Sequence, residues 1–95
     1  MGLEQKQATT LYTGNTDYEE YTTTNLYVQR SFGFPANQLS LVNDSSTDTV
    51  QISFDGATLH YEVGPTEFKD IPANGKTSVY IKATTGGGNV RITAT

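Results

Sequence analysis

Residues 50–63 read Val50-Gln-Ile-Ser-Phe-Asp-Gly-Ala-Thr-Leu-His-Tyr-Glu-Val63, and this stretch sets the class of fold. Apolar and polar residues alternate on both sides of Asp55-Gly56, which places every second side chain on the same face of a strand. The Asp-Gly dipeptide suits the positive φ angles of a tight hairpin turn. The stretch therefore predicts two antiparallel strands joined at Asp55-Gly56.

Further strand signals lie on both sides of this hairpin. Before it come residues 25–32 and 38–42, with a break expected at Gly33-Phe-Pro35. After it, a turn is expected at Asn74-Gly75, and two more alternating runs follow at residues 77–83 and 89–95.

This spacing predicts an all-β fold, namely a small antiparallel β-sandwich or barrel of about six to seven strands. The apolar phase of the alternating runs predicts one shared core. Its expected members are Val50, Ile52, Phe54, Leu59, Tyr61, Val79, Ile81, Val90 and Ile92.

The first residues differ from the rest. Residues 1–24 are rich in Thr, Gln and Glu and show no sustained helical or alternating period, so we expect an extended polar N-terminal arm there. Residues 25–95 would then form the single β-sandwich domain. Tyrosines lie in or beside the arm, and they would either bind a partner or pack back on their own domain. These candidate partner-binding residues are Tyr12, Tyr18, Tyr21 and Tyr27.

Composition excludes several classes of protein. The 95 residues allow one domain, and no stretch has the roughly 18 apolar residues of a membrane helix, so no membrane partner is expected. The start has no apolar export segment, which predicts a soluble, unsecreted product. A net charge of −4 with six scattered Lys and Arg argues against nucleic acid. The absence of cysteine removes disulfides and thiolate metal sites.

Short motifs resemble functional sites without completing them. Gly75-Lys76-Thr77 matches the end of a phosphate-binding loop, but Asp70 stands where that loop needs glycine. Asp44-x-Ser46-x-Asp48 begins like a calcium loop, yet Thr49 replaces its glycine, so a polar turn is favoured.

The chemistry of catalysis is also incomplete. His60, the single histidine, falls on the polar side of its strand, and the sequence contains no motif of an activated nucleophile to go with it. Glu19 and Glu20 lie in the expected arm, where no rigid pocket would tune their pKa values. We therefore expect no catalytic residues, no cofactor and no metal, and hence no enzyme. Asn43-Asp44-Ser45 matches a glycosylation acceptor, for which an unsecreted chain has no use.

One longer pattern resembles a known class. The segment Leu41-Val-Asn-Asp-Ser-Ser-Thr-Asp-Thr-Val-Gln-Ile-Ser-Phe-Asp-Gly56 is similar to one that recurs in small β-domain structural proteins of tailed bacteriophages. Ser78-Val-Tyr-Ile-Lys82 and the closing Val90-Arg-Ile-Thr93 are similar as well. The resemblance covers about residues 39–95 and leaves out the arm.

The resemblance implies a non-enzymatic virion component, synthesised in the host cytoplasm. Capsid decoration is the favoured role, with the major capsid protein or another virion protein as partner and a homo-oligomer as the expected state. A neck, tail or head-fibre attachment component is the alternative within the virion. A carbohydrate-binding module is the alternative outside it, with Tyr80 and Tyr27 as the only candidate platforms in the strands.

Overall fold

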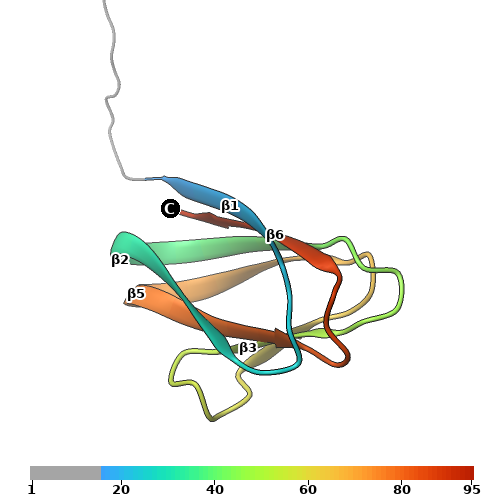
Figure 1. The fold of residues 1–95 in the computed structure, drawn as a ribbon. Coiled ribbons are helices and arrows are strands. Elements are labelled where there is room, and N and C mark those ends of the chain that lie inside the picture. The colour runs from blue at the N-terminus through green and yellow to red at the C-terminus, as the bar shows by residue number, and fades with distance from the viewer. Residues whose placement is uncertain (1–15) are drawn as a thin grey trace, which may run out of the picture.

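The computed structural model describes residues 16–95, and in that part of the chain the fold is all-β, as predicted. Six antiparallel strands form one open sheet with the order β1-β6-β2-β5-β3-β4 (Figure 1). The strands are β1 (Asp17–Thr22), β2 (Val28–Asn43), β3 (Val50–Ser53), β4 (Tyr61–Val63), β5 (Phe68–Ala83) and β6 (Asn89–Ala94). Among the described residues there is no helix long and apolar enough to span a membrane.

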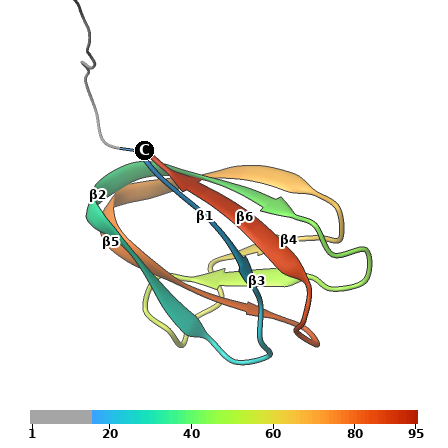
Figure 2. The same cartoon turned by 45° about the horizontal axis from the view of Figure 1, so that its top comes forward.

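The sheet folds over because its two longest strands bend together. β2 and β5 have 16 residues each and pair antiparallel from end to end. The second half of β2, Leu39–Asn43, also pairs with β6, whereas the end of β5, Tyr80–Ala83, pairs with β3. Figure 2 shows both strands curling around one end of the molecule, which places the two halves of the single sheet face to face.

Register shifts between Ser31 and Gln38 mark the bend in β2. Gly33 has a φ of 84°, and on β5 Asn74 and Gly75 have φ of 53° and 81°. The expected break at residues 33–35 and the expected turn at Asn74-Gly75 are therefore wrong as strand ends. Both are irregularities inside continuous strands, since the positive φ that makes a turn can equally make a bulge that bends a strand.

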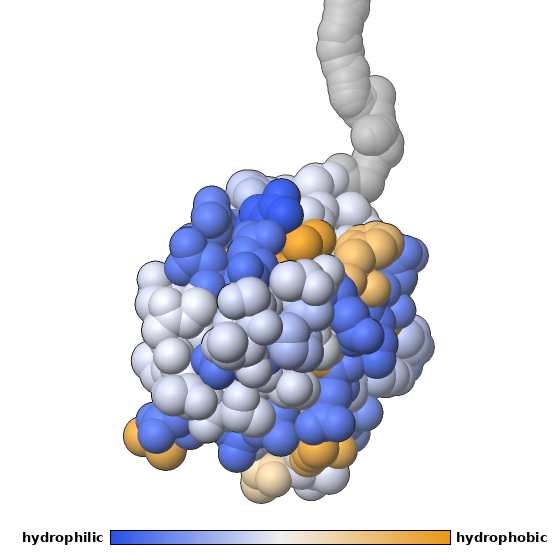
Figure 3. All heavy atoms as spheres, turned by 90° about the vertical axis from the view of Figure 1, so that its right-hand side faces the viewer, coloured by the Kyte–Doolittle hydropathy of each residue, from blue (hydrophilic) through white to orange (hydrophobic). Residues whose placement is uncertain are grey.

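The core lies between the two halves of the folded sheet. Six of its nine predicted members are fully buried, and Phe54 and Tyr61 pack against it while partly exposed. Only Leu59 is wrong, with 47% of its surface exposed. Further buried side chains include Phe32, Leu39, Leu41, Val63 and Ile71. Figure 3 shows that on one outer face hydrophobic residues form small separate patches among polar ones.

The hairpin of residues 50–63 exists, but its turn is longer than predicted. Val50 pairs with Val63 and Ile52 with Tyr61, so residues 54–60 form the connection. Asp55 explains this, because its Oδ1 accepts the backbone N–H groups of Ala57 at 2.8 Å and Thr58 at 2.7 Å. These hydrogen bonds hold the chain in a wound loop instead of a two-residue turn. They also keep the pKa of Asp55 well below its ordinary range, Thr58 contributing most.

The expected arm is too long. Residues 17–22 form β1, which pairs with β6 from Asp17 opposite Ala94 to Thr22 opposite Asn89. Thr23 continues the pairing, since its N–H donates to Gly88 O at 2.8 Å. Residues 17–23 therefore belong to the sheet and not to an extended arm, and residues 1–15 lie outside the described part of the chain. The alternation of β1 escaped notice because Asp17 and Glu19, which point inward, are charged.

Candidate binding surfaces

The four predicted tyrosines do not form one surface. Tyr18 is 57% exposed on the outer face of β1, while Tyr21 of the same strand points inward and packs against the core. Tyr27 is partly buried, with Lys82 Nζ 4.5 Å from its ring centre. Tyr12 lies outside the described residues. Of the two roles expected for these tyrosines, packing on their own domain is what the structure shows for Tyr21, and partner binding by the set stays a prediction.

A slit runs between β1 and the first half of β2. It encloses about 450 Å³ and is lined by Glu19, Tyr21, Val28, Gln29, Arg30 and Ser31. It exists because β6 pairs only with the second half of β2, so the first half has no strand on that side. Below, the slit means the space lined by these six residues.

Arg30 joins the two walls of the slit electrostatically. Its Nη2 donates to Asp17 Oδ2 at 2.8 Å, and its Nε lies beside Glu19 Oε1. Its Nη1 donates to the backbone carbonyl of Ser31 at 2.8 Å. One inward cation thus interacts with both inward carboxylates of β1, where a closed barrel would have backbone hydrogen bonds.

The Tyr21 hydroxyl is an unsatisfied polar group in the slit. It is buried and has no hydrogen-bond partner among the described residues. Burial raises the pKa of this phenol well above its ordinary value; the nearby Arg30 opposes the shift and Glu19 adds to it. A buried hydroxyl without a partner costs free energy, so the slit is incompletely packed for a polar group.

Both walls have backbone groups that no strand among residues 16–95 pairs with. Bonded and non-bonded pairs alternate along antiparallel strands, and Thr23 N–H donates to Gly88 O, so Tyr21 and Glu19 also face β6. Tyr18, Glu20 and Thr22 then direct their N–H and C=O groups to the outer edge of β1. The same alternation, starting from the bond between Thr84 N and Thr49 O, leaves the backbone N–H groups of Gln29 and Ser31 unpaired in β2.

A second hollow lies where the loop 54–60 faces the bend of β5. Its volume is about 340 Å³, and its walls are aromatic on the loop side and polar on the β5 side. Sequence reasoning missed it, because it placed the candidate platforms at Tyr27 and Tyr80. Tyr80 is partly buried, its ring packing close to Gly56, whereas the hollow brings together Phe54, His60 and Tyr61.

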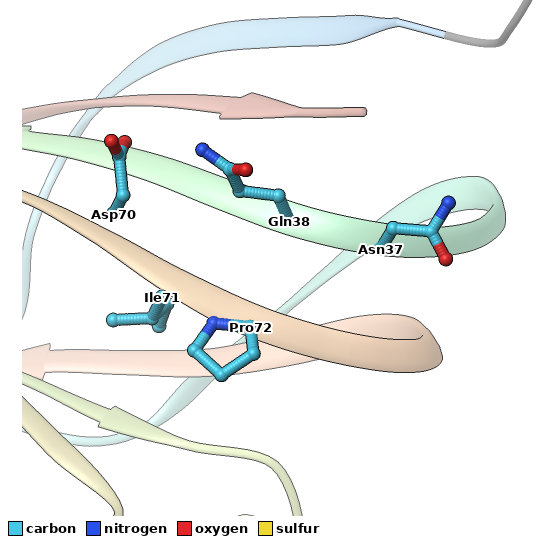
Figure 4. A pocket seen from close by; sticks show the side chains of 5 residues that line it. All are labelled: Asn37, Gln38, Asp70, Ile71 and Pro72. Atoms are coloured by element: carbon cyan, nitrogen blue, oxygen red, sulfur yellow. The ribbon is translucent and has the colours of Figure 1, made fainter.

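A third hollow, of about 290 Å³, lies along β2 and β5 beyond the bend. Its polar side chains are Asn37, Gln38 and Asp70, and Figure 4 shows them spread along the strands instead of converging on one point. Asp70 already accepts a hydrogen bond from Ser40 Oγ at 2.6 Å. This arrangement offers a ligand little directional binding.

The loop that begins like a calcium site has a structural role. Arg91 binds both carboxylate oxygens of Asp44, at 2.8 and 2.9 Å, and this hydrogen bonding lowers the Asp44 pKa. Asp48 is buried and accepts the backbone N–H of Gly86 at 2.9 Å. Residues 16–95 contain no cluster of three or more His, Asp or Glu side chains arranged to hold a metal ion. Residues 44–49 connect β2 to β3, as expected of a polar turn.

Asn43 holds this loop in place from inside the protein. Its amide donates to the carbonyls of Asp48, Val63 and Gly64 at 2.8 to 3.1 Å, and its Oδ1 accepts the N–H of Ser45. The glycosylation-like asparagine is 1% exposed and fully used by these bonds. Gly75-Lys76-Thr77 lies within β5, so no helix follows it as a phosphate-binding loop requires.

Comparisons of the chain with protein-family models, with curated proteins and with solved structures find no match.

Proposed function

We propose that the chain is a non-enzymatic structural protein of a tailed-phage virion, and that it decorates the capsid by accepting a strand of the major capsid protein at the outer edge of β1. The resemblance of residues 39–95 to phage β-domain proteins supports the virion role. A homo-oligomer on the particle is part of the same proposal.

The observation that carries the attachment step is the outer edge of β1 beside the slit, which pairs with no other strand of residues 16–95. An edge strand with free N–H and C=O groups is a template for strand addition, a common way in which proteins bind extended segments. The edge lacks two of the usual protections, because β1 has no proline and no bulge in its pairing with β6.

Charge favours a foreign strand over a second copy. β1 reads Asp-Tyr-Glu-Glu-Tyr-Thr and contains no basic residue. Two such strands paired antiparallel would place acidic side chains near one another, which is destabilising. The fitting partner is an extended segment with Lys or Arg, and a homo-oligomer would then form through another surface.

A proline at the edge tests the attachment. The N–H of Glu20 points away from β6, so Glu20→Pro leaves the sheet intact but removes one outward donor and places a ring on the edge. Glu20→Ala is the matched control, because it removes the same charge and keeps the N–H. The measurement is co-sedimentation with capsids assembled without the protein, together with thermal melts of each variant.

Wild type and Glu20→Ala should bind capsids, and Glu20→Pro should bind at least about tenfold more weakly at an unchanged melting temperature. Equal binding by all three proteins would disprove attachment through the outer edge of β1, while capsid decoration would remain the proposed role. Failure of the wild type to bind capsids, with binding to purified tails or necks instead, would move the proposal to the alternative position in the virion.

A truncation addresses the remaining candidate anchor. Removing residues 1–24 would delete β1 itself, so the informative deletion ends at residue 15. If Tyr12 contributes to attachment, this deletion weakens capsid binding while the sheet of residues 17–95 still folds.

A further inference from the structure

We propose that the hollow between the loop 54–60 and the bend of β5 binds a glycan, with one pyranose ring seated against its aromatic wall. We call it the aromatic hollow; it is lined by Phe54, Asp55, His60, Tyr61, Asn74 and Lys76, with Pro72 at its margin. The proposal is independent of capsid decoration.

The aromatic wall is rigid. Phe54 and Tyr61 are partly buried against the core, and their rings meet edge to face with centres 6.4 Å apart. His60 lies beside Phe54 at 5.7 Å, and its Nδ1 accepts the backbone N–H of Phe54 at 3.1 Å. That bond fixes the imidazole and leaves Nε2 as the nitrogen that donates in the neutral ring. Rings held in this way present area at low entropic cost.

The hollow also has polar side chains, Asp55 on the loop side and Asn74 and Lys76 on the β5 side. On the loop side, the Asp55 carboxylate adds acceptor oxygens to the hollow; its Oδ1 accepts hydrogen bonds from Ser53 Oγ and from the backbone N–H groups of Ala57 and Thr58. Within residues 16–95 the Asn74 amide makes no hydrogen bond and Lys76 makes no ion pair. An acceptor, an amide with both functions and a donor therefore surround one space.

This combination matches the chemistry of a sugar. A pyranose has an apolar face of C–H groups, which packs on aromatic rings, and a rim of hydroxyls, each of which both donates and accepts. A purely apolar ligand would desolvate the side chains of Asn74 and Lys76 without giving them hydrogen-bond partners, at a cost. A volume of about 340 Å³ is at the lower end for small-molecule sites and suits one or two rings.

Asn74 allows a clean test. Its φ of 53° favours glycine, so Asn74→Gly removes the amide and keeps the backbone. Asn37→Ala is the control, because Asn37 is exposed and lies outside the aromatic hollow. Substitution of Phe54 or Tyr61 would be ambiguous, since both contact the core.

The experiment is a titration of the full chain, followed by amide chemical shifts. The probes are glucose, galactose, N-acetylglucosamine and their β-linked disaccharides cellobiose, lactose and chitobiose. At least one probe should cause saturable shifts at residues 54–61 and 72–76. Asn74→Gly should weaken that binding about three- to tenfold, and Asn37→Ala should leave it unchanged.

Two results would overturn the proposal. One is that no probe gives saturable shifts, or that the shifts lie elsewhere on the sheet. The other is that Asn74→Gly and Asn37→Ala bind the sugar equally well. Neither result bears on capsid attachment, because Glu20 and the slit lie on other strands and are tested with particles.

Discussion

Two regions of the molecule, the loop at residues 43–49 and the slit between β1 and β2, differ in how fully their buried polar groups are hydrogen-bonded. At residues 43–49, Asn43 and Asp48 are buried, the Asn43 amide is hydrogen-bonded to backbone groups, and the Asp48 carboxylate accepts the backbone N–H of Gly86. At the slit, Arg30 and two carboxylates span the walls, and the Tyr21 hydroxyl has no partner among the described residues. Satisfied buried polar groups stabilise one arrangement, whereas partly satisfied ones leave room for another. The loop is therefore the fixed end of the molecule, and the slit is the place where a partner gains most.

The largest test of this comparison uses the two halves of β2. Leu41, in the half that pairs with β6, is fully buried, whereas Val28, beside the slit, is 45% exposed. Leu41→Ala should lower the free energy of unfolding by about 2–5 kcal/mol, from lost burial and the cavity left behind. Val28→Ala should cost less than about 1 kcal/mol. Urea denaturation measures both, and similar losses would mean that the slit half is as tightly packed as the core.

Much of this core could be predicted, because alternation in a strand is local. Val50, Ile52 and Val90 each occupy the apolar phase of a short run, and burial follows from that phase alone. Leu59 had the same phase but lies in a loop, because the side chain of Asp55 binds the backbone ahead of it. A competing hydrogen bond of this kind is not visible in an apolar pattern.

The candidate sites were harder to predict because they depend on contacts between distant residues. Asn43 binds carbonyls 20 and 21 positions away, at Val63 and Gly64. Phe54 and Asn74 share the aromatic hollow only because β5 bends at Asn74 and Gly75. Sequence spacing indicates that such a position can bend, but not what the bend brings together.

A second test addresses the fixed end. Asn43→Ala leaves three carbonyls and the N–H of Ser45 without their partner in a buried place. We expect a loss of about 1–3 kcal/mol in the free energy of unfolding, since unpaired buried groups keep their desolvation cost. Asn37→Ala, at an exposed site, should change it by less than about 0.5 kcal/mol. Equal stabilities of the two variants, measured by urea denaturation, would show that the bonds of Asn43 are not needed to hold the loop.

The smallest expected change in the free energy of unfolding is at the slit, and there it should be a gain instead of a loss. Tyr21→Phe removes a buried hydroxyl that has no partner among residues 16–95 and keeps the ring packed against the core. The free energy of unfolding at pH 7 should stay equal or rise by up to about 1 kcal/mol. A loss of more than that would mean that the hydroxyl is hydrogen-bonded, by water or by residues outside the described part, and that the slit is already satisfied.

Alkaline pH separates these explanations. Burial raises the folded-state pKa of Tyr21 above its unfolded value of about 10, so the neutral phenol favours the folded state. That contribution is complete below pH 10 and is lost as the pH rises from there toward the folded-state pKa, because unfolding then releases the proton. Tyr21→Phe should therefore lose less stability than wild type above pH 10, and Tyr18→Phe, at an exposed ring, should follow wild type. If the free energies of unfolding of Tyr21→Phe and wild type fall in parallel above pH 10, the hydroxyl is in contact with solvent. The slit is then already filled by water, and a partner would gain little by entering it.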